Sequence, residues 1–320
     1  MGAGTGWVAF LGALAAVWAG LASAGEAAEV WVANMGAAEL QVIDSETLRV
    51  EATVPVGRGA HAVAFSGDGR VAVVATVTGD ALHVVDAGAR RVVGTVSGAG
   101  PAHAIAVSPD GSLAAVSGFR KDFVTLIDLS ARKILGTVTT GSEATVSAFS
   151  SDGSLLYVAN AGEGTVSVVE VASRRVLRTL PGARGMSAVI LAPDGRTAWC
   201  AVPKEDRLLT VDLHEGGTAG EVLIPGEPRG LALSPDGTRL YAVQAALQRL
   251  AVVDTVSRRV LRSAALGRRA DHLALEPDGR TLFLVSRGEN KLVRIAAADL
   301  SLQGEVATAH EPHGVACRPR

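Results

Sequence analysis

The stretch Ser66-Gly67-Asp68-Gly69 decides the fold, because a close copy of it returns every 42 residues along the chain. The glycine tolerates a positive φ, and a proline sets φ at the second position in four copies, so each copy predicts a tight β-turn. The aspartates of the copies are Asp68, Asp110, Asp152, Asp194, Asp236 and Asp278. A second acidic column keeps the same spacing, so the repeating unit is longer than the turn. Its members are Asp44, Asp86, Asp128, Glu170, Asp212 and Asp254.

One unit, taken from Met186 onward, contains four short runs with strand character. Each run is rich in β-branched, aliphatic or aromatic residues and is bounded by turn residues, as is typical of β-strands. These runs are residues 188–192, 197–202, 208–212 and 220–224. Tight turns between successive strands make them antiparallel. Four-stranded units that recur every ~40–45 residues are typical of β-propeller blades.

The number of first strands predicts seven blades. They begin near residues 60, 102, 144, 186, 228, 270 and 312. The chain after its N-terminal segment opens on a second strand, Val30–Asn34, and it ends on a first strand, His313–Cys317. We therefore expect the C-terminal strand to complete the blade of the N-terminal strands, which closes the ring and leaves no open sheet edge. The predicted fold is all-β, a single propeller domain over residues 25–320.

The charge balance excludes one class of partner. The chain has 30 Lys and Arg against 32 Asp and Glu, a formal net charge of -2, which gives no strong field for nucleic acid. A hydrophobic content of 48% excludes a disordered chain. We expect a folded monomer that does not bind nucleic acid.

Residues 1–24 carry no charge and end in Ala22-Ser23-Ala24, a form that signal peptidase accepts. They predict a signal peptide cleaved near Ala24, and a periplasmic or secreted protein. An uncleaved anchor is the alternative, because the apolar stretch from Trp7 approaches the ~20 residues that span a bilayer. No later stretch is long enough to do so. Cys200 and Cys317 fall in different blades, so we expect two buried free thiols.

The acidic column at the ends of the third strands has a structural explanation. An aspartate there can accept hydrogen bonds from the backbone amides of the following turn. A catalytic acid has no reason to recur six times. A basic column lies five residues further on, and we expect it to be a solvated face that partners these acids, with an anion-binding rim as the alternative. It consists of Arg49, Arg91, Lys133, Arg175 and Arg259.

The segments Trp31-Val-Ala-Asn34 and Tyr157-Val-Ala-Asn160 resemble the second strands of the YVTN β-propeller repeat family. The Val-Ile-Asp and Val-Val-Asp third strands resemble that family too, and the resemblance covers residues 29–320. It implies the propeller fold, in a family that includes surface-layer-like proteins and proteins of periplasmic redox operons. A more distant likeness, over residues 61–70, is to the haem-binding propeller of dissimilatory nitrite reductase and its haem-biogenesis relatives, which have eight blades.

The residue seven before each turn aspartate begins a first strand, where the mouth of the central channel lies. In the blades that ring closure makes consecutive, this residue is His313, His61 and His103, and Asp271 follows on the other side of His313. Imidazoles and a carboxylate on one arc suit zinc, copper or iron. The predicted metal ligands are His61, His103, His313 and Asp271. The alternative is structural, with each histidine bonded to nearby backbone. His272 is one position out of register and is expected to point elsewhere.

Arginines from the rim loops are expected on the same face as these histidines. With the charged loops between second and third strands, such as the one that holds Arg287, they make this face polar and mixed in charge. A face of this kind suits a docked protein or an anionic small ligand. The predicted rim residues are Arg58, Arg184, Arg229 and Arg269.

Three functions remain open from the sequence. The first is an exported, non-enzymatic scaffold or binding protein that uses the channel mouth for another periplasmic protein or a small ligand. The second is a metal- or cofactor-handling accessory protein of a periplasmic redox system. The third is a hydrolase or lyase at the channel mouth, with Asp271 or a histidine as base. It ranks last because no nucleophile–base motif is recognisable.

Overall fold

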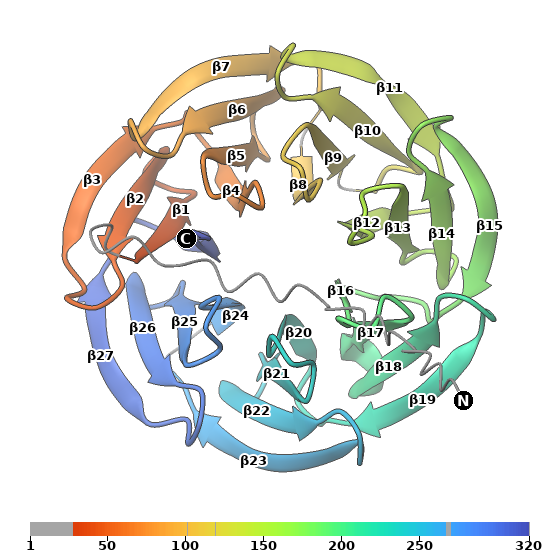
Figure 1. The fold of residues 1–320 in the computed structure, drawn as a ribbon. Helices are drawn as coiled ribbons and strands as arrows, with labels where there is room; N and C mark the ends of the chain where they lie inside the picture. The colour runs from red at the N-terminus through yellow and green to blue at the C-terminus, as the bar shows by residue number, and fades with distance from the viewer. Residues whose placement is uncertain (1–27, 101, 119, 267–269, 320) are drawn as a thin grey trace, which may run out of the picture.

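The computed structural model describes residues 28–100, 102–118, 120–266 and 270–319, which form a ring of seven blades around a central axis (Figure 1). Each blade is a four-stranded antiparallel sheet whose first strand lies nearest the axis and whose fourth lies at the rim. The prediction of an all-β, seven-bladed propeller is confirmed. The predicted signal peptide, residues 1–24, lies outside the described residues.

The strand bounds follow the 42-residue period closely. The closure blade, named for its strands from both ends of the chain, consists of β28 (Pro312–Cys317), β1 (Glu29–Asn34), β2 (Glu39–Asp44) and β3 (Val50–Pro55). The next three blades are β4 (Ala60–Phe65), β5 (Val71–Thr76), β6 (Ala81–Asp86), β7 (Arg91–Ser97); β8 (Ala102–Val107), β9 (Leu113–Gly118), β10 (Phe123–Asp128), β11 (Lys133–Thr139); and β12 (Ala144–Phe149), β13 (Leu155–Asn160), β14 (Thr165–Glu170), β15 (Arg175–Pro181).

The last three blades run up to the closure blade. They are β16 (Ala188–Leu191), β17 (Thr197–Val202), β18 (Arg207–Asp212), β19 (Thr218–Leu223); β20 (Pro228–Leu233), β21 (Arg239–Gln244), β22 (Arg249–Asp254), β23 (Arg259–Ala265); and β24 (Ala270–Leu275), β25 (Thr281–Ser286), β26 (Lys291–Ala296), β27 (Leu302–Ala307). A short 3₁₀ turn, η1 (Pro203–Glu205), joins β17 to β18.

Ring closure occurs as predicted. β28 pairs antiparallel with β1, with Val30 opposite Cys317 and Val32 opposite Val315. The tail after β28 also reaches the next blade, where Arg318 Nε donates to the carbonyl oxygen of Gly69 at 2.8 Å. Gly69 has φ +65° and a Cβ there would collide with the Pro319 carbonyl, so this turn needs glycine twice over.

The aspartates of both acidic columns stabilise turns. Asp68 Oδ1 accepts from the Arg70 amide at 3.0 Å, and Asp44 Oδ1 accepts from the Thr47 amide. The structural explanation of the third-strand column is therefore confirmed. Within the described residues no ion pair joins a member of the basic column to these acids, and Asp254 pairs with Arg239 instead of Arg259.

Seven apolar clusters hold the ring together, one at each joint between neighbouring blades. At the first joint, fully buried Trp31 of β1 meets Phe65 of β4 edge-on, with ring centroids 5.2 Å apart. Each blade thus buries its faces against its neighbours, as in other repeat folds that need adjacent units for a core. The first strands are left with one edge open to the axis.

A β-bulge near the start of the first strands sets what faces the channel. In β4 the register with β5 shifts between Ala60 and Ala62, and β8 and β24 shift at the matching positions. A bulge places an extra residue in one strand and interrupts the simple alternation of side chains. Two consecutive residues can therefore face the axis.

Two smaller expectations concern the thiols and the membrane. Both cysteines are free; Cys200 is buried, and Cys317 is half-buried. Burial raises the pKa of the Cys200 thiol to about 12 and also raises the pKa of Cys317. Among the described residues, no helix is long and apolar enough to cross a membrane.

Candidate functional site

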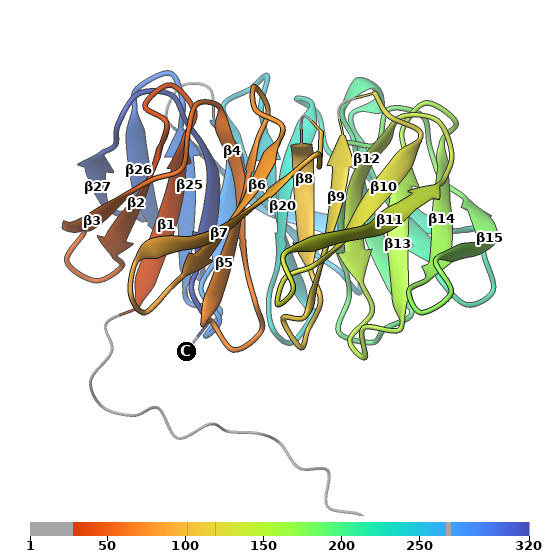
Figure 2. The ribbon, with the colours of Figure 1, turned by 90° about the horizontal axis from the view of Figure 1, so that it is seen from above.

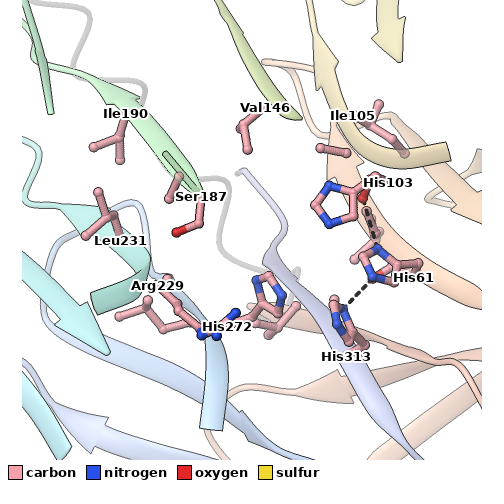
Figure 3. A pocket seen from close by; sticks show the side chains of 18 of the residues that line it. His61, His103, Ile105, Val146, Ser187, Ile190, Arg229, Leu231, His272 and His313 are labelled. Atoms are coloured by element: carbon pink, nitrogen blue, oxygen red, sulfur yellow. Dashed lines mark hydrogen bonds between the residues drawn. The ribbon is translucent and has the colours of Figure 1, made fainter. Parts of the chain in front are cut away.

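A cavity of about 470 Å³ opens on the axis where the first strands begin (Figure 3). Up to four consecutive residues at the start of a first strand line it, from Ser187 to Ile190 in the longest run, so the wall has layers. The outermost layer is His61, His103, Ser187, Arg229 and His313; the next is Ala62, Ala104, Val146, Ala188, Gly230, His272 and Gly314. The layer beneath is Val63, Ile105, Val189, Leu231, Leu273 and Val315. A polar mouth therefore stands over an apolar throat.

Four histidines form a continuous arc on one side of this mouth. The ring of His313 lies with its centroid 3.8 Å from that of His61, and His61 lies 5.2 Å from His103. On the other side, His272 lies 4.5 Å from His313. Neighbouring blades supply the four rings, as ring closure predicted for His313, His61 and His103.

Hydrogen bonds to the next blade hold two of these rings. His61 Nδ1 donates to the His103 carbonyl at 2.9 Å, and His313 Nδ1 donates to the His61 carbonyl at 3.2 Å (Figure 3). Because a carbonyl oxygen can only accept, Nδ1 carries the proton in both rings and Nε2 of the neutral ring keeps its lone pair. Thr145 plays the same part at the equivalent position of β12, where its hydroxyl donates to the Met186 carbonyl at 3.2 Å. His61 and His313 are thus bonded to nearby backbone, as the structural alternative predicts.

The histidines of the arc are neutral at pH 7. Burial, followed by repulsion from neighbouring histidines and from Arg287, lowers the pKa of His61 to about 3. Burial with repulsion from His272 and Arg287 lowers the pKa of His313 to about 3, and burial lowers that of His103. The arc therefore presents imidazoles rather than imidazolium cations to the channel.

The expectation for His272 is wrong: its ring lines the channel. The bulge between Ala270 and His272 adds a residue, so the position after it faces the axis as well. Burial lowers the pKa of His272 to about 3, with repulsion from His61, His103 and Arg229 next. The sequence does contain a signal for His272, because the other blades carry only small apolar residues at the equivalent position. They are Ala62, Ala104, Val146, Ala188, Gly230 and Gly314.

Two arginines complete the mouth. Arg229, predicted as a rim residue, lines the cavity beside His272 (Figure 3), and Arg287 enters from the loop after β25. Each is paired outward, Arg229 Nη2 with Glu227 at 3.1 Å and Arg287 Nη2 with Glu311 at 3.2 Å. Arg287 was placed on this face by sequence but not in the site.

The other predicted rim residues do not join the cavity. Arg58 and Arg184 are exposed on loops and do not line it, although the Arg58 carbonyl accepts from Thr78 Oγ1 at 2.8 Å, which shows that both loop sets meet on this face. Arg269 lies outside the described residues. Asp271 belongs to β24, but its side chain also lies outside what the structure describes.

Among the described side chains, no group of three or more His, Cys, Asp or Glu is arranged so that it could hold a metal ion. In the arc, the rings of His61 and His313 are tilted by 32° with their centroids 3.8 Å apart. The predicted set of three histidines with Asp271 stays a prediction, since that carboxylate is not among the described side chains.

Comparisons in sequence find no relative: no protein-family model and no curated protein matches the chain. Solved structures match in fold. Hydrazine synthase of Kuenenia stuttgartiensis aligns with a TM-score of 0.76 at 20% identity, over 85% of this chain and 92% of that one. A functionally unknown protein from Desulfotomaculum acetoxidans aligns with a TM-score of 0.80 at 17% identity, over 90% and 98%.

A third structure, dihydro-heme d1 dehydrogenase NirN in complex with DHE, aligns with a TM-score of 0.67 at 17% identity, over 90% of this chain and 74% of that one. At these identities the likeness establishes the propeller fold and nothing finer. The resemblance to the YVTN repeat family is thus supported as far as the fold, and no family model extends it.

Proposed function

We propose that this chain is an exported, non-enzymatic binding protein of the YVTN-type propeller kind, which holds a small ligand in the mouth of its central channel. The cavity on the axis carries the proposal, because it is a preformed concave site with an apolar wall and a few polar groups at its opening. Export follows from the predicted signal peptide.

The repeat itself supports this function. Positions that build the turns keep one residue type in blade after blade, as the six turn aspartates do. The positions seven before each turn aspartate instead carry His, Thr, Ser, Arg and Asp. A rigid scaffold with diversified residues around one opening is typical of a binding site built on a repeat fold.

The hydroxyl in this mouth lacks the activation that a nucleophile needs. Ser187 Oγ is buried and has no hydrogen-bond partner among the described residues, so no base in that part of the chain is positioned to take its proton. This arrangement favours binding over hydrolase or lyase chemistry.

Filling the channel tests the proposal. Ala188 lines the cavity, and Ala188→Trp would occupy it, whereas Leu223→Trp changes an exposed residue of the rim strand β19. The wild-type protein and Leu223→Trp, purified from the periplasm, should carry the same small molecule in native mass spectra, and Ala188→Trp should lack it. Retention by Ala188→Trp, or no bound molecule in the wild-type protein, would contradict the proposal.

The second candidate is the metal- or cofactor-handling accessory protein of a redox system. One observation favours it: donation from Nδ1 to backbone leaves Nε2 of His61 and His313 unprotonated, the state and second shell of a metal-binding histidine. The structure of dihydro-heme d1 dehydrogenase NirN in complex with DHE shares the fold. In this chain His61, His313 or His272 would supply nitrogen to a metal centre, and Arg229 and Arg287 would face its anionic substituents.

Metal analysis distinguishes the two candidates. The purified protein, and the protein exposed to equimolar zinc, copper or iron salts or to haem, is assayed for bound metal and for visible absorbance. Stoichiometric retention that His61→Thr and His313→Thr remove would establish the second candidate. A metal-free, colourless protein that still carries an organic ligand would leave the first.

A further inference from the structure

We propose that Arg229, His272 and Arg287 form an anion-binding head at the channel mouth, and that it takes the carboxylate of an amphipathic ligand whose apolar body lies in the throat. This inference rests on the proposed function, since it names the ligand class of the same cavity. Charge, unused donors and the layered wall each point to it.

The charged side chains in the described part of the lining are positive. Among the described residues that line the cavity, two are arginines and none is a carboxylate. The acids that neutralise these arginines, Glu227 and Glu311, lie outside the lining. Arginine offers five N–H donors in a planar fork that matches a carboxylate, and each outward ion pair engages one terminal nitrogen. The other N–H donors of Arg229 and Arg287 are left to face the channel.

One of these donors is buried without a partner. Arg287 Nε has no hydrogen-bond acceptor among the described residues, although it lies in a half-buried side chain at the cavity wall. A buried N–H group of a charged side chain is costly to leave unbonded, so most such groups in folded proteins are satisfied. A ligand oxygen that draws the Arg287 side chain into the opening would satisfy it.

His272 differs from its neighbours in the arc because no scaffold role occupies it. His61 and His313 use Nδ1 to bond the next blade, whereas within the described part of the chain nothing hydrogen-bonds to the His272 ring. Equivalent positions hold small residues, so the fold does not need an imidazole here. Its ring lies beside Arg229 in the opening (Figure 3), where it can donate to a ligand oxygen.

The apolar throat determines the chemistry and the length of the other end of the ligand. Ile105, Leu231 and Leu273 belong to the apolar layer, which lies two residues further along the first strands than the polar mouth. Two strand residues rise about 7 Å, so a ligand held at the mouth by its charge reaches this layer with a body of six to eight carbons, by that same order-of-magnitude estimate. Small, purely inorganic anions would leave the layer uncovered.

Binding of matched acids and alcohols tests the proposal. Octanoate with octanol, and 2-naphthoate with 2-naphthalenemethanol, are titrated calorimetrically into the full-length mature protein, with acetate as the probe that lacks an apolar body. We expect at least one acid to bind about tenfold more tightly than its alcohol and than acetate. If neither acid exceeds its alcohol, the anion-binding head is overturned.

The repeat supplies conservative variants. Arg229→Ser copies Ser187, and His272→Ala copies Ala188, so both should keep the wild-type melting temperature while binding of the acid weakens about tenfold. Arg58→Ser changes an exposed arginine on the same face that does not line the cavity and is the matched control: binding should be unchanged. Wild-type affinity for the acid in His272→Ala would overturn the assignment of that residue.

Failure of this inference is distinct from failure of the function. If acid and alcohol bind equally and Ala188→Trp abolishes both, the channel mouth is a binding site but not an anion site. If Ala188→Trp binds the acid as the wild-type protein does, both proposals are wrong.

Discussion

The closure blade and the blade of β12–β15 have the same four strands but are held in different ways. In the closure blade, Glu29 is 6% exposed and accepts from Trp31 Nε1 at 2.9 Å, from Arg90 at 2.7 Å and from Arg318 at 3.3 Å. Arg318 follows β28 and Arg90 belongs to the next blade, so one carboxylate ties both chain ends to a neighbour. The blade of β12–β15 has no ion pair among its described residues.

The difference shows where the fold needs added stability. A continuous blade is held by three hairpin turns, whereas the closure blade must hold β28 through one strand pairing and side-chain contacts. Losing that strand would expose a sheet edge, a hazard for aggregation. Charge-assisted bonds to a buried carboxylate are strong enough to secure such a strand.

Removing the closing strand is the most severe test of this comparison. Deleting residues 310–320 removes β28 and the partner of β1, so we expect cooperative thermal unfolding to be lost and the protein to aggregate. A circular permutant that joins the two ends and opens between β15 and β16 keeps every strand and should unfold cooperatively. A soluble truncated protein with a sharp calorimetric transition would show that closure is dispensable.

The second-largest expected effect on stability comes from removing the Glu29 carboxylate. Glu29→Ala leaves two guanidinium groups and the Trp31 indole N–H without their buried acceptor, and we expect a loss of about 3 kcal/mol in the free energy of unfolding. Glu163→Ala, at an exposed loop of the β12–β15 blade, should change it by less than about 0.5 kcal/mol. Urea denaturation measures both. Equal effects would remove the distinction between the two blades.

Acid should act on the closure side more than on the opposite side. The pKa of His61 and of His313 is about 3 in the folded protein, against about 6.5 when unfolded, so the unfolded chain binds more protons between these values. This stability is complete above pH 6.5 and falls as pH drops toward 3, by on the order of 1 kcal/mol per pH unit for each histidine. The double variant His61→Thr and His313→Thr should therefore show a flatter slope in urea unfolding from pH 7 to 5. An unchanged slope would assign acid sensitivity elsewhere.

The 42-residue period of the turns was enough to predict the propeller fold and part of the candidate site. The 42-residue spacing alone predicts that β28 lies beside β1 and that His313, His61 and His103 share one arc. The position of His272 was not predicted, because the alternation of side chains along a strand assumes an uninterrupted ladder of backbone hydrogen bonds. The bulge after Ala270 interrupts that ladder. Arg287 was not predicted in the site, because the path of a loop depends on its contacts. The contact here is with Glu311, and the repeat spacing does not encode it.

The joint of β1 and β28 also decides how the molecule can be attached to something else. Glu29 and Cys317 lie at the end of the closure blade away from His313, so both ends of the described chain leave from the face opposite the channel mouth (Figure 2). A support, a fluorophore or a lipid surface linked to either end would leave the opening uncovered. The protein can thus be immobilised by its termini with every channel facing the same way, toward solution.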